Sequence, residues 1–141
     1  MSYDKLIETL RRHEGVEHTV YEDTMGIKTI GVGRNLESVG LSDEEIDMLL
    51  INDIERTKGL MDTYLPWWSK LDEIRQEALI NFVFNVGIGT AQKFKNAMKQ
   101  LEAGNYEESA DEFLDSAWAK QVKGRAIEVT DMIRTGNRAL L

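Results

Sequence analysis

The sequence predicts one domain of the α+β class, predominantly helical, with a small β region near the amino terminus. Three observations support this: an amphipathic first segment, a Gly-rich segment of alternating and β-branched residues, and a later series of helix start and stop signals. With 141 residues, the chain can bury about two-thirds of its unfolded surface, so it needs neither a disulfide nor a metal to fold.

The first helix is expected to begin at Ser2, whose hydroxyl can cap it, and to end at Gly15. Its apolar residues recur at helical spacing: Tyr3, Leu6, Ile7 and Leu10. His13 and Glu14 therefore fall at the end of this helix.

The segment from Thr19 to Val32 predicts a small hairpin with a further strand possible. Alternating and β-branched residues flank the turn-like sequence Asp23-Thr24-Met25-Gly26. Asp23 is therefore expected in a turn between two strands.

The remaining chain predicts helices only. Ser42 and Glu45 form a capping box that opens a linking helix, which is expected to end at Gly59. Asp72 begins a central helix that breaks between Asn85 and Thr90. Three further helices are expected. Thr90 caps the first, Asn105 with Glu108 caps the second, and the third runs from Arg125 to Arg134.

Composition excludes several classes of function. There is no cysteine, and 25 acidic against 17 basic residues give a net charge of −8. This charge opposes nucleic-acid binding, so we expect no nucleic-acid partner. No apolar run is long enough to span a membrane, and no signal peptide is recognisable, so we expect cytoplasmic synthesis without membrane insertion. His13 and His18 lack further ligands at metal-binding spacing, so we expect no metal site.

Glu14 and Asp23 are candidate catalytic carboxylates. Glycoside hydrolysis needs an acid at the leaving oxygen and a second carboxylate on the opposite face. Two acids on different local elements can face one another across a sugar, and an acid at a helix carboxyl terminus opposes the helix dipole. Spacing alone is weak evidence, because most acidic residues are simply solvated surface.

A longer pattern adds specificity: Glu14-Gly15, Tyr21-Glu22-Asp23-Thr24-Met25-Gly26 and Thr29-Ile30-Gly31-Val32-Gly33, followed by further matches from Arg75 to Gly136. It resembles the bacteriophage-type lysozymes, or endolysin muramidases. The resemblance implies that Glu14 is the general acid, Asp23 the second carboxylate and Thr29 a polar group beside the water. It also implies a two-lobe fold, with a β lobe at about 15–40, a linking helix at about 42–58, and a helical lobe at about 60–141 that includes the first helix.

The resemblance also implies substrate-binding residues. Asn85 and Gly33 are expected to contact sugar, and Arg125 matches an arginine that contacts the acid. Trp118 is included, although a large aromatic near a helix terminus is at least as often part of a core. Because the acid must be protonated near neutral pH, whereas an exposed glutamate titrates near about 4.3, Glu14 is expected to be partly buried.

The activity implied is hydrolysis of the β-1,4 bond between N-acetylmuramic acid and N-acetylglucosamine in bacterial peptidoglycan, without a cofactor. The resemblance further implies a monomer made in the host cytoplasm that reaches the wall at host lysis through a separate pore-forming protein. One departure is Arg34, which stands where well-known members carry a histidine. Two alternatives stay open: an inactive peptidoglycan-binding module, and a chitinase or lytic transglycosylase-like variant.

Overall fold

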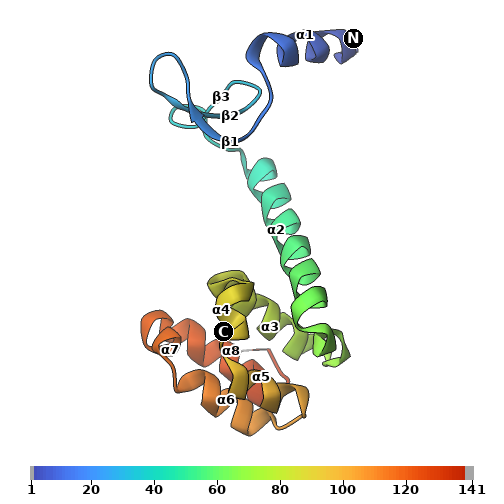
Figure 1. The fold of residues 1–141 in the computed structure, drawn as a ribbon, viewed down its shortest axis with the longest axis vertical. Helices are drawn as coiled ribbons and strands as arrows, with labels where there is room; N and C mark the ends of the chain where they lie inside the picture. The colour runs from blue at the N-terminus through green and yellow to red at the C-terminus, as the bar shows by residue number, and fades with distance from the viewer. Residues whose placement is uncertain (1, 139–141) are drawn as a thin grey trace. The chain divides into compact units, whose positions relative to one another are not determined.

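The structure, a computed structural model, describes residues 2–138 and contains helices with one small sheet (Figure 1). The sheet has three antiparallel strands in the order β1-β2-β3. The predicted α+β class is confirmed. The chain divides into two compact units, the first running to Leu49 and the second starting at Leu50. That the whole chain works as one domain stays a prediction.

In the first unit, helix α1 (Asp4–Glu14) begins close to its predicted start. The Ser2 hydroxyl accepts the Asp4 N–H at 3.3 Å. The helix ends at Gly15, which adopts a φ of 79° and donates its N–H to the Arg11 carbonyl at 2.9 Å. The last residue of the helix is Glu14, as predicted.

The sheet consists of β1 (Glu17–Glu22), β2 (Lys28–Gly31) and β3 (Arg34–Asn35). Thr29 lies at its centre, because it pairs with Tyr21 on one side and Asn35 on the other. The predicted hairpin and further strand are both present, so the sheet brings the turn before β2 and the segment after it into one small structure.

Helix α2 (Asp43–Tyr64) runs across the boundary between the units, and its predicted capping box is formed. The Ser42 hydroxyl accepts the Glu45 N–H, and the Glu45 carboxylate accepts the Ser42 N–H at 2.8 Å. The predicted end at Gly59 is wrong. An interior glycine costs only about 1 kcal/mol, and continuing the helix buries Met61 completely. Pro66 is the effective stop, since a proline disfavours helical backbone in the residue before it.

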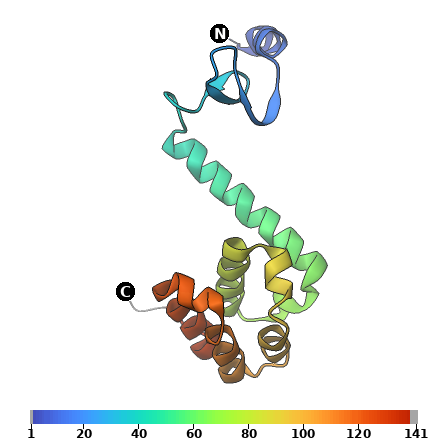
Figure 2. The same ribbon diagram turned by 60° about the vertical axis from the view of Figure 1, so that its left-hand side comes forward.

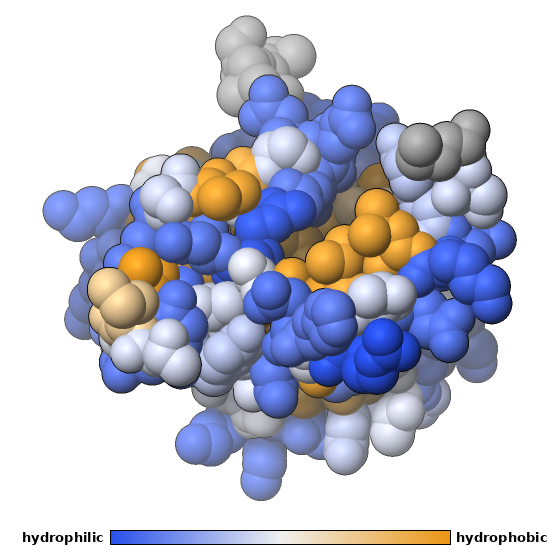
Figure 3. All heavy atoms as spheres, turned by 90° about the horizontal axis from the view of Figure 1, so that it is seen from above, coloured by the Kyte–Doolittle hydropathy of each residue, from blue (hydrophilic) through white to orange (hydrophobic). Residues whose placement is uncertain are grey.

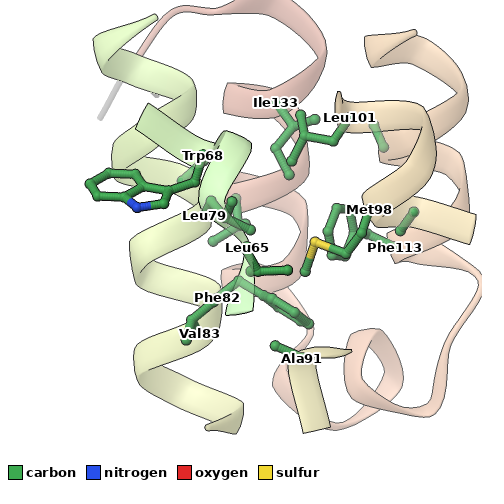
Figure 4. Close-up of a cluster of buried hydrophobic side chains, with 14 of the residues drawn as sticks. Leu65, Trp68, Leu79, Phe82, Val83, Ala91, Met98, Leu101, Phe113 and Ile133 are labelled. Atoms are coloured by element: carbon green, nitrogen blue, oxygen red, sulfur yellow. The ribbon is translucent and has the colours of Figure 1, made fainter. Parts of the chain in front are cut away.

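The second unit contains a hydrophobic core. Met61 of α2 contributes to this core together with the helical elements that follow α2, whose course Figure 2 shows. These elements are η1 (Pro66–Lys70), α3 (Glu73–Val86), α4 (Ile88–Gln92), α5 (Lys95–Glu102), α6 (Tyr106–Leu114), α7 (Ala117–Val122) and α8 (Gly124–Thr135). Phe82 of α3 is fully buried, and the rings of Phe94, Phe113 and Trp118 lie 4.8–4.9 Å from its ring centroid. Figure 4 shows the side chains of Phe82 and Phe113 pointing into this core.

Two predicted caps differ in the structure. Thr90 lies inside α4 rather than before a helix, because a new helix starts directly after the break at Gly87. Asn105 precedes α6, but its side-chain oxygen makes no capping bond, and its NH₂ group donates to Gln100 Oε1 at 2.7 Å. The predicted last helix, by contrast, is present as α8 and ends at Gly136 in a left-handed conformation.

Hydrophobic side chains also reach the surface, and one such patch is visible in Figure 3. In α1 no residue is buried, and the predicted apolar positions Leu6, Ile7 and Leu10 are 42–52% exposed. The predicted spacing of this helix is therefore present, although its apolar residues keep a large exposed surface.

Candidate active site

Glu14 occupies the carboxyl-terminal residue of α1, and its side chain lies against Gly33. A methyl group built at Gly33 would come within 2.7 Å of Glu14 Oε2 and 3.1 Å of its carboxyl carbon. Only a residue without a side chain leaves room for the carboxylate in this position. Glu14 is exposed within the first unit, and its partial burial stays a prediction.

Asp23 holds the turn between β1 and β2 together. Its Oδ1 accepts the N–H groups of Met25 at 2.8 Å and Ile27 at 2.9 Å. Its own backbone N–H donates to the Ile27 carbonyl, and its carbonyl accepts the Gly26 N–H. Both bonds use the same oxygen, which leaves Oδ2 for other partners.

Thr29 is buried in β2, with 3% of its surface exposed. Its hydroxyl donates to the Ile27 carbonyl at 2.8 Å. Since a hydroxyl carries one donor and two acceptor lone pairs, the oxygen of Thr29 can still accept a hydrogen bond from water. Thr29 and Asp23 are thus tied to the same residue, Ile27.

In the first unit the predicted catalytic residues make two separate local contacts. Glu14 meets Gly33, and Asp23 shares Ile27 with Thr29. The other predicted site residues, Asn85, Arg125 and Trp118, belong to the second unit.

Trp118 and Asn85 are linked by a hydrogen bond from the indole Nε1 of Trp118 to Asn85 Oδ1 at 2.8 Å. Trp118 is only 6% exposed and packs edge-on against Phe82. Its place in the core agrees with the structural alternative, and contact with sugar stays a prediction. Asn85 is exposed, and because its oxygen is occupied, its NH₂ group remains as a donor.

Arg125, near the start of α8, donates through Nε to Asn81 Oδ1 at 3.0 Å and through Nη2 to the Asn81 carbonyl. It lines a groove of about 580 Å³ within the second unit, together with apolar side chains that include Ile80 and Phe84. Arg125 is exposed, and its guanidinium is bonded to Asn81, which lines the same groove.

Comparison with known proteins decides the family. The sequence model of the phage lysozyme family matches residues 11–134. This chain belongs to the phage lysozyme family.

Individual relatives agree with this assignment. The probable T4-type lysozyme 1 of Dictyostelium discoideum is 29% identical over 92% of this chain and 93% of its own. The endolysin of Salmonella phage P22 is 30% identical over 83% and 82% of the two chains. The pre-baseplate central spike protein Gp5 of Enterobacteria phage T4 is 31% identical over 94% of this chain, which spans 28% of that protein. Membership identifies the chain as a lysozyme-type glycosidase.

In this phage lysozyme the first unit also contains an ion pair that the sequence analysis did not identify. Arg34 meets Glu45 through two bonds, Nη1 to Oε1 at 2.8 Å and Nη2 to Oε2 at 2.6 Å, and Nη1 also donates to the Gly40 carbonyl. The capping box explained Glu45 as a partner of Ser42 alone. The sequence signal that could have revealed the pair is Arg34 in the predicted β region, followed closely by the acidic residues at the start of the linking helix.

The Arg34 guanidinium, followed by the bonds from Ser42, lowers the pKa of Glu45 from its ordinary 4.5 to about 2. A carboxyl with a depressed folded-state pKa contributes stability that is present above pH 4.5 and is lost as the pH falls toward 2. Both side chains are more than a third exposed, so solvent and salt screen this contribution.

We expect Glu45→Gln to destabilise the first unit at pH 7 and to have a smaller effect at pH 3. All three tryptophans lie in the second unit, so amide hydrogen exchange of residues 28–45 is the appropriate measurement. Glu44→Gln is the matched control, because it removes a neighbouring charge from the same helix turn without touching Arg34. Equal pH dependence in the two variants would refute the assignment.

Among residues 2–138, no group of three His, Asp or Glu side chains could hold a metal ion. In the same part of the chain, none of the helices has the length and apolar character needed to cross a membrane.

Proposed function

We propose that this lysozyme hydrolyses the β-1,4 bond between N-acetylmuramic acid and N-acetylglucosamine in bacterial peptidoglycan. The observation that carries the proposal is the seat of Glu14 against Gly33, found in a chain of the phage lysozyme family. A carboxyl group beside a backbone segment without a side chain gives a sugar room to approach the acid.

In this mechanism Glu14 donates its proton to the glycosidic oxygen as the bond from that oxygen to C1 breaks. Water attacks C1 from the opposite face, and Asp23 takes the proton that the water loses. The two N–H groups on Asp23 Oδ1 hold the carboxylate in place, while its Oδ2 serves the water. Thr29 accepts a hydrogen bond from the same water. The outcome is inversion at C1.

Asn85, Gly33 and Arg125 bind the glycan. The free NH₂ group of Asn85 donates to a sugar hydroxyl or acetamido oxygen, and Trp118 orients that amide from the core. The exposed guanidinium of Arg125 offers the donors that Asn81 leaves unused. Gly33 contributes through its backbone beside Glu14.

The first test is clearing of purified, outer-membrane-stripped peptidoglycan by the wild-type chain and by Glu14→Gln. Removing a general acid typically costs about 10²–10⁴-fold in rate, so the variant should be almost inactive while its circular dichroism is unchanged. Glu8→Gln is the control, since Glu8 is an exposed acid on the same helix. Equal activity of wild type and Glu14→Gln would remove Glu14 as the acid.

Product analysis separates the remaining alternatives. Hydrolysis yields reducing ends, whereas a transglycosylase yields an anhydro sugar, and NMR of the first-formed anomer distinguishes inversion from retention. Wall binding by an inactive wild type would favour the binding module, and cleavage of chitin in preference to peptidoglycan would favour the chitinase. We further propose that the protein acts as a monomer in host lysis and that a separate pore-forming protein delivers it to the wall.

A further inference from the structure

We propose that Arg34 is a positioning residue for Glu14: by clamping the segment after Gly33 to the first turn of α2, it holds Gly33 against the carboxylate of the acid. This inference rests on the proposed function, in which Glu14 is the general acid. It assigns a catalytic consequence to an ion pair that would otherwise be only structural.

The first step is the contact between Gly33 and Glu14. Gly33 has a φ of 67°, in the left-handed region, and its Cα faces the Glu14 carboxylate so closely that a methyl group would be 2.7 Å from Oε2. The backbone of Gly33 thus forms one side of the space that the Glu14 carboxylate occupies, which is called its seat below. A displacement of this backbone changes the position available to the carboxylate.

The second step is the weakness of the local sheet. Strand β3 contains only Arg34 and Asn35, and its register with β2 consists of two residue pairs. So short a strand provides little hydrogen bonding to fix its own position. Beyond the ladder, the segment is held by one further backbone bond to β2, from Leu36 N–H to the Lys28 carbonyl, so an additional side-chain anchor would contribute substantially to its position.

The third step is that Arg34 provides this anchor through three hydrogen bonds. Two connect it to Glu45 in the first turn of α2, and one connects it to the carbonyl of Gly40, at the far end of the connecting loop. The loop also closes on Asn35, whose side chain accepts the N–H groups of Glu37 and Ser38 at 2.9 Å. The planar guanidinium makes all three bonds at once, which a single ammonium group would not reproduce.

The fourth step is transmission to the acid. Arg34 directly follows Gly33 in the chain, so one peptide bond separates the clamped residue from the wall of the seat. Releasing the clamp lets Gly33 move relative to Glu14, while the hydrogen bonds of Asp23 and Thr29 to Ile27 stay intact. The expected defect is therefore in proton donation, seen in kcat, rather than in glycan binding, seen in KM.

The test compares Arg34→Gln, Arg34→Lys and Glu45→Gln with the wild type on soluble peptidoglycan glycan fragments. A misplacement of about 1 Å can cost about a hundredfold in rate, and we expect a loss of about tenfold in kcat with KM changed less than about twofold. Arg34→Lys should recover part of the loss. Arg56→Gln, which breaks an exposed ion pair with Asp53, is the matched control and should keep the wild-type kcat.

A second readout does not depend on catalysis. NMR of ¹³C- and ¹⁵N-labelled protein should show that Arg34→Gln shifts the Gly33 amide and the Glu14 Cδ resonances, whereas Arg56→Gln leaves both in place. Should the wild type prove inactive on glycan, the proposed function fails, and these resonances still decide whether Arg34 positions Glu14. A lower thermal stability of Arg34→Gln with unchanged kcat and unchanged resonances would overturn the proposal. If Arg34→Gln does not fold, the same measurements on Arg34→Lys and Glu45→Gln decide the question.

Discussion

Gly33→Ala is expected to reduce kcat by about a hundredfold or more. A displacement of a catalytic group by about 1 Å can produce an effect of this size. The new methyl group would lie 2.7 Å from Glu14 Oε2, a distance that no stable contact allows. Glu14 is the side chain that must move, because its carboxylate is the far end of a flexible chain. The Glu14 carboxyl group would then no longer lie within reach of the expected position of the glycosidic oxygen.

The same substitution should change stability far less than it changes activity. A residue other than glycine at a φ of 67° costs about 1–2 kcal/mol. The clash itself adds little to this value, since the exposed Glu14 side chain can rotate into solvent. The prediction is therefore a folded protein with a misplaced acid.

Gly104→Ala separates the two effects. Gly104 has a φ of 83°, and a methyl group built there meets nothing within 4 Å, so the variant has the same kind of backbone cost without touching Glu14. Steady-state kinetics and urea unfolding of both variants provide the comparison. A similar small loss of kcat in both would mean that only the backbone matters and that Gly33 does not define the seat of the acid.

The turn around Asp23 was predictable from the sequence because its hydrogen bonding is local. Asp23 accepts bonds from Met25 and Ile27, a pattern that short turn sequences determine by themselves. The approach of Gly33 to Glu14, by contrast, depends on the path of the whole sheet. No local signal reports it, which is why Gly33 was assigned only by resemblance.

The limits of helix prediction here have the same origin. Gly59 is a legitimate stop signal when judged locally, yet α2 passes through it because Met61 and Leu65 become buried in the second unit. Trp118 was assigned to the substrate for its position in the family pattern. Its burial beside Phe82 depends on how α3 and α7 pack together, which the sequence alone does not give.

The largest effect on stability is expected from Phe82→Ala, which should lower the free energy of unfolding by about 3–5 kcal/mol. Phe82 is fully buried, and three aromatic rings pack edge-on around it, those of Phe94, Phe113 and Trp118. Each such pair contributes about 0.5–1.5 kcal/mol beyond burial. Since small proteins are stable by about 5–15 kcal/mol, urea unfolding followed by tryptophan fluorescence should show a large shift in the midpoint.

Phe84→Ala is the matched control, because Phe84 lies on the same helix and is 42% exposed. Its loss should be less than about half as large, in proportion to the apolar area it removes from burial. The core variant should also affect binding: Trp118 can move into the cavity, its bond to Asn85 would weaken, and KM should rise in the folded fraction. Equal destabilisation by the two variants would show that the aromatic cluster around Phe82 does not hold the second unit together.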